Sequence, residues 1–149
     1  MTRTTPGATI VSIGYEQRSV EEVIALLRRN NVEVLVDVRL NPISRKKGFS
    51  KSSLGQALDA ADIEYRHERE LGNPKSNRDP FRRGLKSART RYLLHLQNGA
   101  SMKYREVIDL AHRNRVALLC FERDHHECHR SCIVDHARAD HPELTVLEL

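Results

Sequence analysis

Five short apolar runs alternate along the 149-residue chain with segments whose apolar residues recur at helical spacing. The runs are Ala8 to Ile13, Val32 to Val38, Ile63 to His67, Val116 to Phe121 and Leu144 to Leu147. Short apolar runs bounded by charged or turn residues are typical of buried strands, and strands that alternate with helices favour a parallel sheet. The alternation therefore predicts a single α/β domain over residues 1–149, a three-layer α/β/α fold with a mostly parallel five-stranded sheet. It does not predict the strand order.

Helical segments fill most of the intervals between the runs. Ser19 and Glu22 have the S-x-x-E spacing of a capping box, and we expect the helix that follows to end at Asn30 and Asn31. Further helices are predicted from Ser50 or Ser53 to about Ala61, and over Tyr92 to Gln97, Met102 to Asn114 and Arg130 to Asp140. Right-handed crossovers then place the carboxyl ends of the strands at one edge of the sheet, where open α/β sheets bind ligands.

The segment from Arg69 to Arg91 lacks a helical period and carries an excess of basic residues. These are Lys75, Arg78, Arg82, Arg83, Lys86 and Arg89. A long polar segment in a compact domain is usually either a functional lid or disordered. We expect a basic lid that orders over an anionic ligand.

Positive charge is in modest excess, with 25 Lys and Arg against 20 Asp and Glu and a formal net charge of +5. The excess favours an anionic small molecule or nucleic acid as partner, although it is also common on solvated surfaces. The absence of tryptophan argues against a large stacking platform for single strands. No run of about 18 apolar residues occurs, and Met1 to Gly7 lacks the apolar centre of a secretory signal, so we expect a cytoplasmic protein without membrane contact.

All three cysteines, Cys120, Cys128 and Cys132, lie within or just after the fourth apolar run. An odd number clustered late in the chain is not a disulfide framework. Cys128, Cys132 and His136 share one face of the last predicted helix and could bind zinc. Their spacing departs from paired C-x2-C knuckles, however, and a cysteine at mid-strand, such as Cys120, usually behaves as a small core residue. We therefore expect no metal and no cofactor, and keep a zinc-stabilised domain as an alternative.

Cys128 is also a candidate nucleophile, because it stands where the last predicted helix begins. A helix amino terminus with His129 and Arg130 beside it would lower the thiol pKa and favour the reactive thiolate. The chain lacks the C-x5-R spacing of phosphatase and sulfurtransferase loops, since Val134 stands six residues after Cys128. A cysteine packed beneath the loop at the helix start is the alternative interpretation.

Two acidic residues stand near strand ends and are candidates for proton transfer. Asp37 lies near the end of the second run and Glu122 directly after the fourth. Burial among arginines would fix the ionisation of either carboxyl group for work as a general acid or base. A structural ion-pair network that orders the loops is the alternative for each of them.

Arginines and glycines near the same strand ends are candidates for ligand binding. Arg39, Arg45 and Arg130 would clamp an anion, because a guanidinium offers bidentate hydrogen bonds to phosphate or carboxylate. Gly14 ends the first run, where a glycine lets the backbone turn sharply or approach a ligand. Gly72 follows the third run and is predicted to reach the same edge.

Four segments together resemble a known family: SIGYEQRSVEEVI, LVDVRLNPISRKKGFSK, IEYRHERELGNP and ALLCFERDHHECHRSCIVDHA. Their order and their most specific parts, DVR with P-x-S-R, then L-G-N-P, then C-x-E followed by C-H-R, closely resemble the DUF488 family of uncharacterised bacterial and archaeal proteins. The resemblance implies an α/β fold and a set of motif positions, but no reaction. The positions are Gly14, Asp37, Arg39, Pro42, Ser44, Arg45, Phe49, Leu71, Gly72, Cys120, Glu122, Cys128, His129 and Arg130.

The sequence as a whole predicts an enzyme that binds a phosphorylated ligand, a nucleotide or a nucleic-acid segment at the carboxyl edge of the sheet. The arginines would hold the anion, and the reaction would be a hydrolysis or transfer dependent on a cysteine or on acid and base groups. The catalytic candidates are Cys128, His129, Glu122 and Asp37. A non-catalytic nucleic-acid-binding module is the alternative from another functional class.

Overall fold

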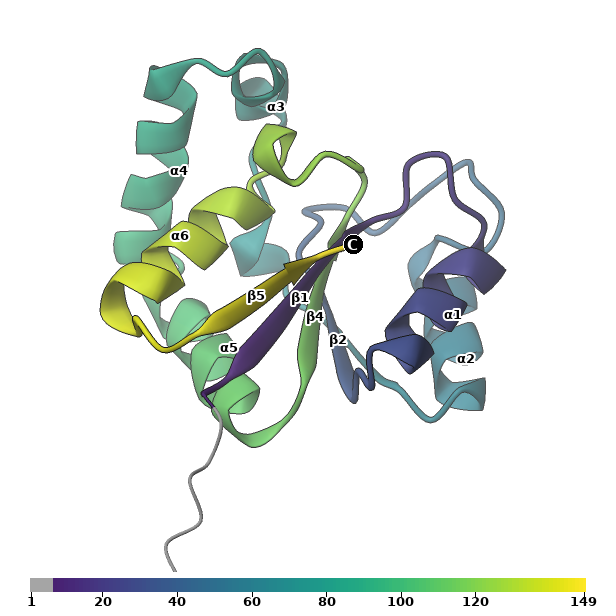
Figure 1. Ribbon diagram of the computed structural model, residues 1–149. Helices are drawn as coiled ribbons and strands as arrows, with labels where there is room; N and C mark the ends of the chain where they lie inside the picture. The colour runs from purple at the N-terminus through teal and green to yellow at the C-terminus, as the bar shows by residue number, and fades with distance from the viewer. Residues whose placement is uncertain (1–6) are drawn as a thin grey trace, which may run out of the picture.

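The computed structural model describes residues 7–149, which contain a five-stranded parallel sheet with helices on both faces (Figure 1). The strands are β1 (Thr9–Gly14), β2 (Val34–Asp37), β3 (Glu64–His67), β4 (Val116–Cys120) and β5 (Thr145–Glu148). The predicted three-layer α/β fold is confirmed, and every strand pairing is parallel. The prediction about Met1 to Gly7 concerns residues that, apart from Gly7, lie outside those described.

The helices begin and end close to their predicted boundaries, except in the basic segment. They are α1 (Val20–Arg29), α2 (Lys51–Ala60), α3 (Lys75–Arg82), α4 (Lys86–Gln97), α5 (Ser101–Arg113) and α6 (Arg130–Asp140), with short 3-10 turns η1 (Arg69–Leu71) and η2 (His125–Glu127). The capping box is present, because the Ser19 hydroxyl accepts from the Glu22 amide and the Glu22 carboxylate accepts from the Ser19 amide. Within residues 7–149, none of the helices has the length and apolar content needed to span a membrane.

The prediction of an irregular segment from Arg69 to Arg91 was wrong, because η1, α3 and the first half of α4 lie there. The helices bury only a narrow stripe, with Ala88, Tyr92 and Leu96 one turn apart in α4, and the basic residues around this stripe hide its period. The Tyr92 hydroxyl donates to the Leu71 carbonyl at 2.5 Å and ties α4 to η1. The segment is thus packed into the domain, while its closure over a ligand stays a prediction.

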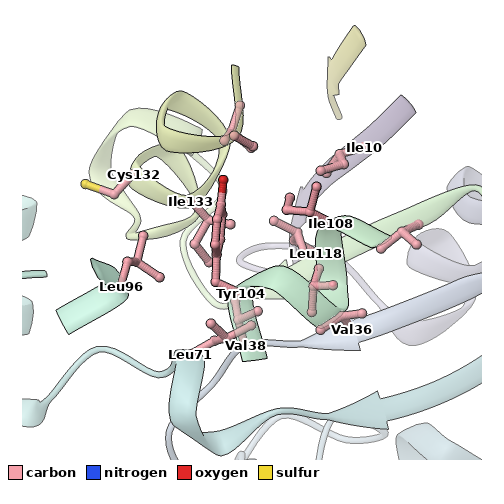
Figure 2. Packing of buried hydrophobic residues seen from close by; sticks show 14 of the residues in the cluster. Ile10, Val36, Val38, Leu71, Leu96, Tyr104, Ile108, Leu118, Cys132 and Ile133 are labelled. Atoms are coloured by element: carbon pink, nitrogen blue, oxygen red, sulfur yellow. The ribbon is translucent and has the colours of Figure 1, made fainter. Parts of the chain in front are cut away.

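Both faces of the sheet are covered by apolar packing. Alternate strand residues such as Ile10, Val36 and Leu118 pack with α4, α5 and α6 (Figure 2). The intervening residues, such as Val11 and Leu35, pack with α1 and α2 on the opposite face. Because the three inner strands, β1, β2 and β4, are buried on both sides, their sequences lack the polar-apolar alternation of a half-exposed strand.

The sheet order is β3-β2-β4-β1-β5, which puts β4 at the centre. After β1 the chain crosses through α1 to β2 on one side, and after β4 it crosses through α6 to β5 on the other side. β1 and β4 are neighbours, paired from Ile10 with Val116 to Gly14 with Cys120. Connections that leave two adjacent strands in opposite directions open a crevice at their carboxyl ends, which is where such sheets bind ligands.

Candidate functional site

Two glycines let backbone segments meet at the carboxyl edge. A Cβ atom on Gly14 would stand 1.9 Å from the Glu122 carbonyl oxygen, and one on Gly72 would stand 2.5 Å from the Leu40 Cα. No side chain fits at either separation, so these positions need glycine for close packing of the chain. Gly14 thereby holds the segment after β4 against the end of β1.

A recess of about 290 Å³ opens beside this contact. Its walls come from the ends of β1, β2 and β4, the loop after β2, helix α3 and the start of α6. Four of the predicted site residues line it, namely Arg39, Arg45, Glu122 and His129. The other five, Gly14, Asp37, Gly72, Cys128 and Arg130, lie in or behind its walls.

Asp37 and Arg39 form a buried ion pair in which nearly every polar atom has a partner. The Asp37 carboxylate accepts from Arg39 Nε at 2.9 Å and Nη2 at 2.7 Å, from the Arg39 amide at 3.1 Å, and from the Tyr65 hydroxyl at 2.6 Å. Arg39 Nη1 donates to the Phe49 carbonyl at 2.7 Å and to the Tyr15 hydroxyl at 3.2 Å. The pair therefore fastens the loop after β2 and leaves little capacity for a ligand.

Cys120, Cys128 and His129 form a buried group at the floor of the recess, which we call the thiol–imidazole cluster. Cys120 is the last residue of β4, and Cys128 and His129 immediately precede α6. The Cys128 Sγ lies 3.6 Å from the Nδ1 of His129, whose Nε2 lies 2.9 Å from the Val38 carbonyl. Because a carbonyl only accepts, Nε2 carries a proton and Nδ1 faces the thiol.

The surroundings of the thiol–imidazole cluster separate the pKa values of its two thiols. Burial alone would raise the pKa of Cys128, but the hydrogen bond from Cys120 and the positive charges of His129 and Arg130 hold it well below its ordinary value. The hydrogen bond to Cys128 and burial raise the pKa of Cys120 well above its ordinary value. The cluster thus favours a thiolate at Cys128, stabilised by a thiol at Cys120.

Glu122 and Arg130 retain buried polar atoms without partners. Within residues 7–149, Glu122 Oε2 and Arg130 Nε are the buried side-chain atoms that lack a hydrogen bond. Glu122 Oε1 accepts from Arg82 Nε at 3.1 Å, and Arg130 Nη2 donates to the Glu122 carbonyl. An unsatisfied buried polar atom is energetically unfavourable in a folded protein and often marks a place where a ligand binds.

Two basic segments of the sequence meet at the recess. Arg45 comes from the loop after β2, and Arg78 and Arg82 come from α3. Besides its contact with Glu122, Arg82 has its Nη1 3.9 Å from the carboxylate of Asp79, which lies one turn earlier in α3. These three arginines, which we call the rim arginines, line the same recess as Cys120 and His129 and supply the positive field that an anion needs.

Several recess residues were not among the predicted site residues, including Tyr15, Asn73, Arg78, Arg82 and Cys120. Cys120 was predicted to be a core residue, although the polar loop that begins two positions later, at Glu122, was a signal of the edge. Asn73 belongs to the L-G-N-P motif, and its side-chain carbonyl accepts from Asn77 at 3.0 Å. The α3 arginines were predicted only as part of a basic lid over an anionic ligand, and not as single ligand contacts.

The cysteine and histidine donors gather differently from the arrangement expected on the last helix. Cys128, Cys132 and His136 do not converge. In the part of the chain that the structure describes, the groups of three close donors are Cys120 with Cys128 and His129, and the partly exposed His112 with His141 and Glu143. In the buried group Cys128 is thus joined by Cys120 from β4 and by His129, instead of by Cys132 and His136 from α6.

One comparison with known proteins gives a match, to a family model described as a domain of unknown function, DUF488, which covers residues 19–137. The matched region includes β2, β4 and the start of α6, and therefore most of the recess. No curated protein and no solved structure shows a significant match to the chain.

Proposed function

Because the chain belongs to the DUF488 family, whose function is unknown, we propose its function from the site itself. The protein is an enzyme that binds a phosphorylated small molecule, a nucleotide or the end of a nucleic acid at the carboxyl edge of the sheet. The observation that carries the proposal is a single recess that joins three rim arginines to a buried thiol–imidazole cluster. One small ligand in the recess could therefore contact both the arginines and the thiol–imidazole cluster.

The anion is held by the arginines of the rim. Arg45, Arg78 and Arg82 line the recess from two segments, so a phosphate group bound there could be contacted by side chains of both. Hydrogen bonds between charged groups contribute about 1.5–3 kcal/mol each. Arg39 and Arg130 support the site differently, because their guanidinium groups hold the loop after β2 and the segment after β4.

The size and lining of the recess favour a nucleotide-sized ligand. Its volume of about 290 Å³ lies at the lower end of ligand pockets, which range over roughly 300–1,000 Å³. Ile43 and Phe121 line it and are 79% and 39% exposed. These apolar side chains offer contact area to a base or another flat group while the arginines bind phosphate.

The reaction is a hydrolysis or a group transfer at the ligand's phosphate end. The thiolate form of cysteine is both the nucleophile and the metal ligand, and the thiol–imidazole cluster favours that form at Cys128. Glu122 lies two residues beyond Cys120 and lines the same recess, where its unpartnered oxygen can accept a proton.

Titration calorimetry with inorganic phosphate and with nucleoside mono- and diphosphates tests the binding. We expect Arg45→Gln to weaken binding of the best ligand at least tenfold, as loss of one charged hydrogen bond implies. Arg113→Gln is the matched control, because Arg113 ends α5 and precedes the amino end of β4, far from the recess along that strand. Binding by neither wild-type protein nor control, or equal affinity for the Arg45 variant, contradicts the proposal.

A nucleic-acid-binding module is the second candidate, favoured by the meeting of two basic segments at one recess. Such a module binds phosphates non-specifically, so a gel shift with short DNA and RNA at about 50 mM salt should be strong and should weaken steeply with added salt. Under this candidate Glu122→Gln leaves the shift intact and no turnover of nucleotides is observed. Absence of a shift at that salt concentration rejects it.

A further inference from the structure

Two thiols and an imidazole meet at the floor of the recess, one thiol from the end of β4 and the other two groups from the residues just before α6. The ligand atoms of Cys120, Cys128 and His129 lie within 4.8 Å of one another, and all three residues are buried. We propose that these side chains bind one zinc ion. Two thiolates and one imidazole are a ligand set that zinc accepts in catalytic sites, where three protein ligands leave a fourth position open.

The separation of the donors agrees with a shared metal ion. Zinc bonds of about 2.3 Å to sulfur and about 2.05 Å to nitrogen, set at the tetrahedral angle, put the two donors about 3.6 Å apart. The Cys128 Sγ and His129 Nδ1 are 3.6 Å apart. The charges also balance, since two thiolates neutralise a divalent cation bound among buried side chains.

His129 has the second contact that metal-binding histidines need. Its Nε2 donates to the Val38 carbonyl at 2.9 Å, which fixes the ring and turns Nδ1 toward the two thiols, where zinc would take the place of a proton. Metal-ligating histidines almost always donate their other ring N–H to a carbonyl or carboxylate in this way. Val38 directly follows β2, so the neighbouring strand orients a ligand that belongs to the start of α6.

The open position of the ion faces the recess. Cys120 and His129 line the recess, whereas Cys128 is 1% exposed and lies behind them. Glu122 lines the same space and has a buried oxygen without a partner. The inaccessible Cys128 thus fits a ligand better than an attacking nucleophile, and Glu122 is placed to accept a proton from a water on the ion.

The chemical consequence rests on the proposed function and names its reaction as phosphate-ester hydrolysis. A water on the zinc ion loses a proton to Glu122, and the resulting hydroxide forms a bond to phosphorus. The bond from phosphorus to the leaving alkoxide breaks, and Glu122 returns its proton to that oxygen. The rim arginines hold the remaining phosphate oxygens, so no oxidant or further reactant is required.

Elemental analysis of untagged protein, purified without chelators, tests the ion directly. We expect about one zinc per chain, retained in Cys132→Ser and lost in Cys120→Ser and Cys128→Ser. Cys132 is the matched control, because it is buried four residues after Cys128 but does not belong to the donor group. Metal-free wild-type protein, or full zinc content in both cluster variants, overturns the proposal.

Cobalt(II) added to chelator-treated wild-type protein gives a second measurement that does not depend on whether the variants fold. Sulfur ligation produces intense near-ultraviolet charge-transfer bands, which the His112, His141 and Glu143 group cannot produce because it has no sulfur. Their absence contradicts the zinc site. The two proposals fail separately: zinc without phosphate binding rejects the proposed function, and phosphate binding without any metal rejects the zinc site.

Discussion

The two carboxylates of the carboxyl edge, Asp37 and Glu122, differ in how completely they are bonded. Asp37 is fully buried and accepts four hydrogen bonds, three from Arg39 and one from Tyr65. Glu122 is almost as buried, yet one of its oxygens has no partner and the other meets only the half-exposed Arg82. The two carboxylates are thus similarly buried but differ in their hydrogen bonds. Asp37 holds the structure of the site together, whereas Glu122 is available to a ligand.

The contrast extends to the residues around each carboxylate. Beside Asp37, the Arg39 guanidinium donates hydrogen bonds to a carboxylate, a carbonyl and a hydroxyl. Beside Glu122, Arg130 keeps an unpartnered Nε, and the thiol–imidazole cluster brings three donor atoms together. The comparison separates a β2 side of the edge whose polar groups are already bonded from a β4 side to which the proposed chemistry is assigned.

The largest expected effect on stability comes from Asp37→Asn. Removing the charge from one partner of a buried ion pair leaves the Arg39 guanidinium uncompensated, at a cost of about 3–5 kcal/mol. Urea unfolding should show this loss in the free energy of unfolding. A loss below about 1 kcal/mol would mean that Asp37 is not the structural carboxylate described above.

Gly14→Ala tests the contact that joins the two sides. The added Cβ would stand 1.9 Å from the Glu122 carbonyl oxygen, so the segment after β4 must shift, and we expect a loss of about 1–3 kcal/mol together with weaker phosphate binding. Gly55→Ala in α2 is the control, because its Cβ would meet Tyr65 at an ordinary 3.6 Å. That control should gain roughly 0.5–1 kcal/mol in thermal or urea unfolding.

Glu122→Gln makes the same chemical change as Asp37→Asn, but we expect it to lower turnover and to leave the free energy of unfolding nearly unchanged. Because its ion pair with Arg82 is partly exposed, its loss should change the free energy of unfolding by less than about 1 kcal/mol. Loss of a general base lowers turnover by about 10²–10⁴, while phosphate affinity holds or rises since a negative charge is removed. Unchanged turnover, measured once a substrate is known, would contradict the role of Glu122.

The smallest effect concerns His125, which begins η2 in the connection after β4 and whose Nδ1 lies 2.6 Å from the Ser12 hydroxyl oxygen. Burial lowers the pKa of His125, so the folded protein keeps it neutral where the unfolded chain binds a proton. Its contribution is therefore present above pH about 6.5, the ordinary histidine value, and declines as the pH falls through it. Unfolding series from pH 8 to 5 should show a shallower decline for His125→Gln than for wild-type protein.

Sequence patterns predicted the elements well where apolar residues recur at helical spacing. The predicted bounds of α6, Arg130 to Asp140, are those observed. The pattern failed for α3 and the first half of α4, because the few apolar residues there are outnumbered by charged ones. A helix whose few buried residues stand among many charges is therefore easily missed.

The chemistry of the site was harder to predict than its place. The carboxyl edge followed from the alternation of strands and helices, but the approach of Cys128 to Cys120 depends on how the connection after β4, which contains η2, folds back onto the end of that strand. The same holds for Arg39, whose partners come from three separate segments. A sequence names the charged residues, whereas only the three-dimensional arrangement shows which of them are already paired.

The central position of β4 also constrains how the chain folds during synthesis. β1 pairs with β4 and β5, and Ile10 lies beside Val116. The first strand therefore cannot form its native pairs until most of the chain has been synthesised. Until then its edges are unpaired, which slows folding and exposes strands to pairing with other molecules. Chains that end before β4 should consequently aggregate instead of forming a partial domain, and the nascent protein should depend on chaperones until its last third emerges.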